Sequence, residues 1–286
     1  MRRNGSVASG YDNRSDQTRN HKRRRGRKME DRGEFCCGFP DFQRKVRQEY
    51  SRFFDGLAEL QDLQAKMLQP RAREPLHKVI RHISIIISNS FGAVLFLVVN
   101  GYGNDAMRIA RSMFEGAVTV GYLRRHPEEL TDYFGFHWIR QKRLVDFYQK
   151  WNPEQFAEIE PAAIEEIEKN FQSVAPHFLK GKRPRDRWCL KSFRVMTEEV
   201  GVSQMYPTLY SWASSMMHFD IGALTSQQAD DGDVDVAPSL EWSREALVSA
   251  HNTLLLALNE YNEVAQLNFK EQLGRMSERF QEAWKP

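Results

Sequence analysis

Apolar residues recur at three- and four-residue intervals from Phe42 to the end of the chain, whereas the strict alternation of a half-buried strand is scarce. This period is that of an amphipathic α-helix with one face in a core. The expected helices cover residues 41–68, 75–99, 104–125, 127–151, 153–171, 187–200, 207–220 and 239–282. The sequence therefore predicts an all-α protein, an antiparallel helical bundle with a long C-terminal helix.

Proline and glycine mark the expected helix ends. Prolines that stand at an expected first helical turn, where the missing N–H costs nothing, are Pro75, Pro127, Pro153 and Pro207. The link Gly101–Asn104 is short. We therefore expect helix 75–99 to fold back against helix 104–125 as an antiparallel hairpin.

The most apolar stretch runs from Ile83 to Val99 and is 17 residues long. Its length is at the lower limit for a membrane span, it contains serines and Asn89, and no aromatic belt borders it. We expect a buried central helix and no membrane partner. No apolar segment of the signal-peptide type follows the N-terminal basic residues, so we expect a cytoplasmic protein.

Charge is divided unevenly along the chain. Residues 1–34 hold eleven Lys or Arg against five Asp or Glu, a net charge of +6, and the remainder carries −3. With few apolar residues to bury, this segment is expected to be a disordered basic tail, followed by a single helical bundle domain over residues 35–286. The tail can serve as a nucleic-acid arm or a nuclear-localisation signal, but we favour a dispensable leader, with Met29 as the actual start.

Cysteine usage and motif content narrow the chemistry. Cys36, Cys37 and Cys189 form no CxxC pair and no even disulfide framework, which is typical of a reducing compartment and argues against structural zinc. The sequence contains no P-loop, no dinucleotide-binding glycine motif and no HExxH motif. A di-metal bundle would need Glu-x-x-His on two helices, and only Glu74 and His77 have that spacing. We therefore expect no metal and no cofactor.

One expected helix carries a polar stripe on an apolar background. Arg108, Arg111, Glu115 and Tyr122 lie on one face of helix 104–125, and Arg111 and Glu115 are spaced to pair with each other. This pair is either a buried clamp that fixes helix register or an anion site, in which Arg111 binds the anion and Glu115 orients it or acts as a base. The residues alone leave both interpretations open.

A second polar stripe lies in helix 207–220, where Tyr210, Ser214 and His218 follow one another at four-residue intervals. A lone histidine on such a face is more often a satisfied core residue than a catalyst, and the alternative is a catalytic or ligand-binding stripe. No nucleophile elbow or oxyanion hole is recognisable in the sequence, which disfavours acyl transfer.

Basic residues also gather between two expected helices, at Lys180–Arg187. A glycine and a proline break helical structure there, so we expect a loop. Lys182, Arg183 and Arg185 are either solvated surface residues, which is the default interpretation, or contacts to phosphate.

The motifs of both stripes together resemble those of a known group of proteins. In chain order the motifs are Arg111-Ser112-x-x-Glu115, Tyr122-Leu123, Trp188, Glu199-Val200-Gly201 and Tyr210-x-x-x-Ser214-x-x-x-His218. Over residues 50 to 265 this order resembles an uncharacterised bacterial family of all-helical proteins, a domain of unknown function. The resemblance implies a helical bundle without an established activity, with recurrent polar positions at Arg111, Glu115, Tyr210, Ser214 and His218.

That family is in turn distantly similar to the HEPN helical domains, many of which are metal-independent ribonucleases in toxin and antiphage systems. Their signature is an Arg and a later His with four to six residues between them. This sequence departs from the signature, because residues 211–213 before His218 contain no Arg.

Two functions follow as hypotheses. In a metal-independent, RNase-like or otherwise nucleic-acid-linked defence factor, His218 is the general acid or base, Arg111 stabilises the transition state, and residues 180–187 hold the phosphates of RNA or another phosphate-bearing ligand. In the alternative, the bundle is non-catalytic and senses a ligand or a protein partner, its polar stripes being a structural core network. The long C-terminal helix can also project to a second copy in a homodimer. Both hypotheses require Arg111, Glu115 and His218 to share one pocket.

Overall fold

The computed structural model describes residues 38–180, 183–218, 221 and 238–285 of the chain. These residues belong to one compact unit that begins at Gly38. The predicted basic tail over residues 1–34 lies outside the described residues, as does the vicinal pair Cys36 and Cys37. The fold is therefore the fold of the predicted bundle domain.

Helices dominate the described residues, and the all-α prediction is confirmed. The α-helices are α1 (Pro40–Glu49), α2 (Ser51–Asp55), α3 (Leu57–Leu68), α4 (Pro75–Val99), α5 (Gly103–Arg125), α6 (Leu130–Trp151), α7 (Pro153–Ala157), α8 (Pro161–Phe178), α9 (Phe193–Val200), α10 (Ala213–His218), α12 (Ser243–Ala265) and α13 (Lys270–Ala283). Shorter elements are the 3₁₀ turns η1 (Pro127–Glu129) and η2 (Ser203–Met205), the π-helix η3 (Tyr206–Trp212), and the strands β1 (Leu179–Lys180) and β2 (Arg183–Pro184). The two strands pair antiparallel over two residues each, which is too little to change the fold class.

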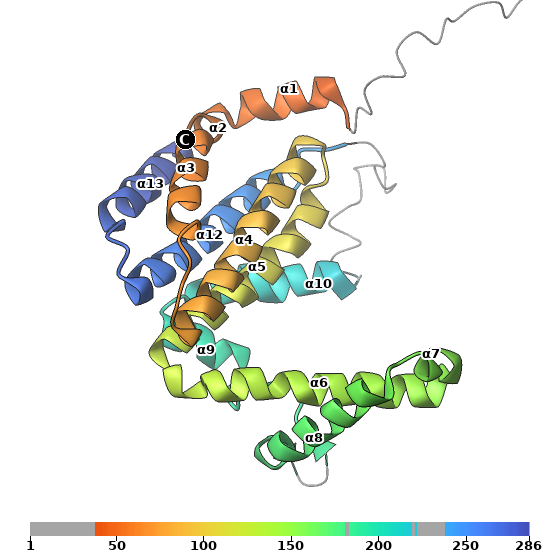
Figure 1. Ribbon diagram of the computed structural model, residues 1–286. Coiled ribbons are helices and arrows are strands. Elements are labelled where there is room, and N and C mark those ends of the chain that lie inside the picture. The colour runs from red at the N-terminus through yellow and green to blue at the C-terminus, as the bar shows by residue number, and fades with distance from the viewer. Residues whose placement is uncertain (1–37, 181–182, 219–220, 222–237, 286) are drawn as a thin grey trace, which may run out of the picture. The chain divides into compact units, whose positions relative to one another are not determined.

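The centre of the bundle is formed by α4, α5 and α12, which lie side by side (Figure 1). Phe91, Phe114 and Tyr261, one from each of these helices, are at most 2% exposed and belong to a single apolar cluster. Removing such apolar surface from water is the main favourable term in folding. This core is the platform on which the polar residues of α5 are held.

The predicted hairpin between α4 and α5 is present, and glycine makes its turn. Gly101 adopts φ +84°, and a Cβ at this position would lie 2.3 Å from the Cβ of Pro238. The backbone N–H of Tyr102 donates to the carbonyl of Leu97 over 2.9 Å and closes the end of α4. Only glycine combines this dihedral with this close approach.

The helix expected over residues 239–282 is divided in two. Gln266 and Asn268 adopt φ of 53° and 61°, in the left-handed region where a helix cannot continue. The side chain of Asn262 stabilises this break, because its Oδ1 accepts a hydrogen bond from the N–H of Phe269 over 2.9 Å. The chain therefore turns back, and α13 packs against α12 rather than extending it.

Helix α4 is buried on one face only. Among the described residues it is the one helix long and apolar enough to cross a membrane. Of its most apolar stretch of 18 residues, 28% is buried. Val94 and Val98 are fully buried, whereas Ile86 and Phe96 are 63% and 53% exposed. The expected burial of this helix is thus confined to the face toward α5 and α12, and the expected lack of a membrane partner stays a prediction.

Helices α6, α7 and α8 form a second region, here called the arm (Leu130–Phe178). The arm has its own small apolar cluster, in which Phe136 and Ile139 of α6 pack against Ala175 and Phe178 of α8. Trp188 packs against both this cluster and the main core. The chain segment around Trp188 therefore links the arm to the bundle.

Candidate functional site

The two polar stripes predicted from the sequence meet in space. Arg111 of α5 donates from Nε to the Oγ of Ser214 over 2.9 Å, and its guanidinium lies 4.6 Å from the ring centroid of Tyr210. Its Nη2 pairs with Oε1 of Glu115 at 2.9 Å. Arg108 donates to the backbone carbonyl of Met216 over 3.1 Å. Helices about a hundred residues apart in the chain are thus joined through side chains of α5.

A π-helix places the second stripe against α5. The expected α-helix over residues 207–220 begins instead with η3, and α10 follows from Ala213. Leu209, Ala213 and Met216 are buried and anchor this segment to the core. The Oγ of Ser214 donates to the carbonyl of Tyr210 over 2.6 Å while accepting from Arg111. Wide turns of this kind occur frequently at functional sites, because the extra residue redirects side chains.

The Arg111 guanidinium is occupied by protein groups at each of its nitrogens. Besides Ser214 and Glu115, the Sδ of Met217 lies 3.1 Å from Nη1. The Arg111 side chain is 13% exposed and that of Glu115 is 40% exposed. This arrangement is typical of a clamp that holds α5 and α10 in register. It leaves Glu115, and not Arg111, as the member of the pair that faces solvent.

Replacing Arg111 with alanine is expected to lower the free energy of unfolding by about 2 kcal/mol, because Ser214 and Glu115 lose a charged donor. The loss stays below that of a fully buried pair since Glu115 can be hydrated. Urea denaturation measures the difference. Ser112→Ala, at the exposed neighbouring position, is the matched control and should leave stability unchanged. An Arg111→Ala variant as stable as the control would contradict the clamp.

His218 does not join this cluster. It lies exposed at the end of α10. No hydrogen bond or ion pair between described residues connects it to Arg111 or Glu115. Of the three groups expected to share a pocket, the structure brings together the guanidinium and the carboxylate.

The basic loop is divided between a described and an undescribed part. Lys182 lies outside the described residues, and Arg183 is described only in its backbone, as part of β2. Arg185 folds back on the arm, with its guanidinium 4.8 Å from the ring centroid of Phe178 and 3.5 Å from a carboxylate oxygen of Asp132. Its side chain is only 11% exposed. Arg185 is therefore packed against the arm and is not a solvated residue.

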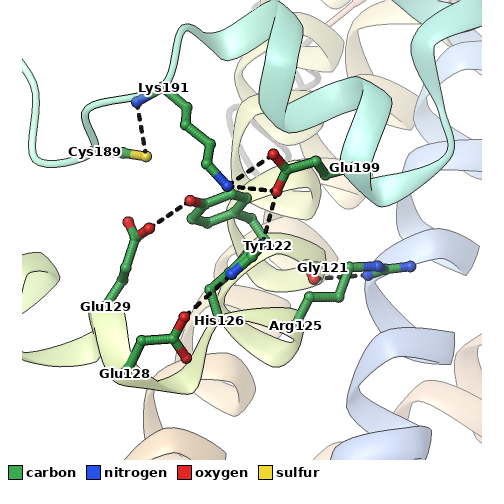
Figure 2. Close-up of polar contacts among 9 residues, drawn as sticks. All are labelled: Gly121, Tyr122, Arg125, His126, Glu128, Glu129, Cys189, Lys191 and Glu199. Carbon is green, nitrogen blue, oxygen red and sulfur yellow. Dashed lines mark hydrogen bonds and ion pairs between the residues drawn. The ribbon is translucent and has the colours of Figure 1, made fainter.

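A second polar cluster surrounds the C-terminal end of α5, and Figure 2 shows its contacts. The hydroxyl of Tyr122, which is fully buried, donates to Glu129 over 2.6 Å. Lys191 pairs with Glu199 at 2.8 Å and lies 5.2 Å from the centroid of the Tyr122 ring. His126 contacts the same carboxylate through Nε2 at 2.7 Å. The predicted stripe of α5 thus ends in a different set of partners from those of Arg111.

The environment fixes the protonation states in this cluster. Burial, followed by hydrogen bonding to Glu129, holds the pKa of Tyr122 far above its usual range. Burial also raises the pKa of the Cys189 thiol. The hydrogen bond from Lys191 lowers the pKa of the Glu199 carboxyl, and the same contact raises the pKa of Lys191. At neutral pH the cluster therefore holds a neutral phenol, a neutral thiol and a lysine–glutamate ion pair.

A cleft of about 260 Å³ lies between the two clusters. Its lining residues are Glu115, Thr119, Arg187, Trp188, Cys189, Lys191, Phe193, Met196 and Tyr210. Three of these carry aromatic rings, and the rings of Phe193 and Tyr210 lie 4.6 Å apart between centroids. Arg187 is exposed and makes no ion pair or hydrogen bond with the described residues. The cleft thus combines flat apolar surfaces with one carboxylate and two cations.

Local sequence explains how α9 and the preceding segment border this cleft. The expected helix over residues 187–200 begins only at Phe193, because the Oγ of Ser192 accepts from the N–H of Val195 and caps it there. Helix α9 also approaches α5 closely, since a Cβ at Gly121 would lie 2.8 Å from Cγ1 of Val200. The segment 187–192 therefore lies outside the helix, and four of its residues line the cleft.

Sequence reasoning missed most of this second cluster. Glu199 was noted only as part of the motifs that resemble the helical family, and His126 and Lys191 were not predicted as site residues. Glu199 stands 73 residues from His126, and no periodic pattern spans such a separation. The i,i+8 pair of Lys191 and Glu199 also crosses a helix start, so helical spacing did not predict it.

The fold and the site define an all-helical protein with a polar and aromatic cleft beside its central helix. The chain belongs to a family of unknown function (DUF5677), whose model matches residues 77–235. This range contains every residue that lines the cleft. No curated protein and no solved structure matches the chain. The resemblance to an uncharacterised helical family is therefore confirmed, and the more distant likeness to HEPN domains stays a prediction.

Proposed function

We propose that this protein binds a phosphate-bearing ligand with a flat ring system, a nucleotide or the end of an RNA strand, in the cleft between α5, α9 and η3. One observation carries the proposal. Arg187 makes no ion pair with the described residues and lies beside the aromatic residues Trp188, Phe193 and Tyr210. A cation next to stackable rings is the combination by which proteins hold single nucleotides.

Each lining residue has a role in this proposal. Arg187 contacts the phosphate, since its guanidinium has no other partner to give up among the described residues. Tyr210 and Phe193 lie against each other and give the cleft an aromatic wall for a base. Glu115 accepts hydrogen bonds from ring N–H groups or from a ribose hydroxyl. Lys191 supplies N–H donors to the cleft wall, and Glu199 holds it in place and balances its charge.

Arg111 contributes to the cleft indirectly, through its contacts with Glu115 and Tyr210. Its ion pair balances the charge of Glu115, and its guanidinium packs on the ring of Tyr210. This role agrees with the hypothesis that the polar stripes form a structural network. The ligand-binding form of the non-catalytic hypothesis is accordingly the one we favour.

Ligand binding is tested by titrating the full chain with inorganic phosphate, nucleoside monophosphates and a short single-stranded RNA, followed by calorimetry. We expect Arg187→Ala to weaken binding about tenfold, the loss expected for one charge-assisted hydrogen bond. The fold should be unaffected because the side chain is exposed. Arg47→Ala, an exposed arginine on α1, is the matched control. Equal affinities of the two variants, or no saturable binding of any probe, would overturn the proposal.

The ribonuclease hypothesis is the catalytic form of the same proposal. Glu115 faces the cleft with 40% of its side chain exposed and is the carboxylate through which a bound 2′-hydroxyl could be deprotonated. Incubation with labelled RNA in the presence of EDTA tests this form. Cleavage that is lost in Glu115→Gln would support it, and intact RNA would leave binding as the function of the cleft.

A further inference from the structure

The outer face of α6 exposes large apolar side chains in a regular stripe. His137, Arg140, Leu144, Phe147 and Trp151 follow one another at alternating three- and four-residue spacing. Leu144, Phe147 and Trp151 are 48%, 54% and 67% exposed. These five residues are here called the arm stripe. The buried residues of α6, such as Phe136 and Ile139, face α8 instead.

The residues of the arm stripe have the spacing that is found where two α-helices pack along each other. Residues that alternate at three and four positions stay on one side of an α-helix, and this seam is what one helix of a coiled coil presents to another. The stripe spans two heptads, from His137 to Trp151, and its apolar members are Leu144, Phe147 and Trp151 in the second of them. Apolar side chains gathered on a solvent-exposed face mark an interaction surface. Isolated exposed apolar residues would need no such explanation.

The distribution of charge over the arm indicates which kind of partner binds the arm stripe. Residues 130–151 contain four Lys or Arg and two Asp or Glu, a net charge of +2, and residues 152–178 contain one Lys and six Glu, a net charge of −5. The arm is therefore divided into a basic helix α6, which carries the stripe, and an acidic part formed by α7, α8 and the residues between them. The arm carries positive charge on α6 and negative charge on α7 and α8. A second copy of the arm has the same two regions of charge, so the two copies can attract each other.

Some of the charges on the arm make no ion pair with the described residues, whereas Lys142 pairs with Asp146 and Glu168. Arg140 lies over the ring of Phe136 and Lys150 over that of Trp151, and neither makes an ion pair with a described residue. Exposed glutamates of α7, α8 and the residues between them that make no such pair are Glu154, Glu158, Glu160, Glu165 and Glu166. Unpaired cations on α6 and unpaired carboxylates on α7 and α8 are complementary between two copies of the arm.

We propose that the arm stripe is the interface through which two copies of this chain form a homodimer. The copies meet face to face about a two-fold axis, so that each apolar stripe covers the other. A symmetric interface of this kind uses the same patch on both chains, which is what a self-complementary stripe with divided charge provides. The interface lies on the arm, and neither copy has to give up a contact of the bundle core.

The test is the molar mass of the full chain in solution, measured by sedimentation from about 1 µM to about 100 µM, the range in which modest interfaces dissociate. We expect a dimer whose dissociation constant rises at least about tenfold in the double variant Phe147→Glu/Trp151→Glu, because two buried aromatic anchors become charged. Both side chains are exposed in the single chain, so the circular dichroism spectrum and melting temperature should not change.

Two controls make the result specific. Ile86→Glu/Phe96→Glu places the same charges on exposed apolar positions of α4 and should leave the dimer intact. A wild-type chain that is monomeric over the whole range would overturn the proposal, as would a dimer disrupted by the α4 variant and not by the arm variant. A gel shift with single-stranded RNA that is lost in the arm variant would also overturn it, because the arm stripe would then be a nucleic-acid surface.

Discussion

Replacing both Arg124 and Arg125 with alanine is expected to lower the free energy of unfolding by about 3 to 5 kcal/mol. The reason is Glu260 of α12, which is 3% exposed and pairs with both arginines. Arg125 lies 3.1 Å from each carboxylate oxygen. Without the two guanidinium groups the carboxylate would remain buried and unpaired, which is among the most destabilising changes a core can undergo.

The same contacts connect stability to the cleft. Arg125 also donates to the carbonyls of Gly121, over 2.7 Å, and Val200, over 3.2 Å. It therefore ties the end of α9 to α5 and α12. Loss of Arg125 should loosen α9, which carries Met196 at the cleft wall.

A substitution of Glu260 tests whether the buried carboxylate is the cause of this loss of stability. Glu260→Gln should cost only about 1 to 2 kcal/mol, because the arginine side chains are roughly 30% exposed and can be hydrated. Urea denaturation of the double variant, of Glu260→Gln and of each single arginine variant gives the comparison. If Glu260→Gln were as destabilising as the double arginine variant, burial of the carboxylate would not be the cause.

Acidification from pH 7.5 to pH 5 is expected to destabilise the protein by about 2 kcal/mol through His251 alone. This residue of α12 is 6% exposed, and its ring centroid lies 3.6 Å from that of Phe280. Neither ring nitrogen has a hydrogen-bond partner among the described residues. Burial lowers the pKa of His251 from 6.5 to about 3. The imidazole is therefore neutral in the folded protein at physiological pH.

The direction of the pH dependence follows from where protons bind. Below pH 6.5 the unfolded chain takes up a proton on His251, whereas the folded chain does so only near pH 3. Protonation thus favours the unfolded state as the pH falls through this window, and the full stability is present above it. The contribution of His251 to the total pH dependence has to be isolated by substitution.

His251→Leu isolates that contribution. Leucine fills a similar volume without a titrating group, so the variant should lose about 2 kcal/mol less than the wild type between pH 7.5 and pH 5. Its packing against Phe53, Phe91 and Phe280 should be retained, since these three neighbours are apolar rings. His82→Leu, at an exposed position of α4, serves as the control. An unchanged pH dependence in His251→Leu would show that this imidazole is hydrated or paired in solution.

Local sequence signals predicted the helical elements well where proline or glycine marks their ends. The helix over residues 75–99 and the turn at Gly101 are present as expected. Boundaries failed where side chains override the apolar period, as at the break stabilised by Asn262 and at the start of α9 capped by Ser192. Capping and backbone reversals of this kind depend on single hydrogen bonds, which periodicity does not register.

The candidate site was predictable only in part. Arg111 and Glu115 are four residues apart on one helix, so their pairing follows from helical geometry. The four-residue spacing of Tyr210, Ser214 and His218 indicated a stripe. It could not indicate that the π-helix and the end of α10 would turn Ser214 toward Arg111 and leave His218 in solvent.

What the sequence by itself determined about this protein is its class and its elements, an all-α chain with a polar stripe on α5, since hydrophobic period and helix-ending residues act over a few neighbours. The tertiary structure decided which polar groups share a cleft. Glu199 meets His126, and Glu260 meets Arg125, across separations of 73 and 135 residues. Such contacts depend on the angle and register at which helices pack, and these are set by the fit of the whole core.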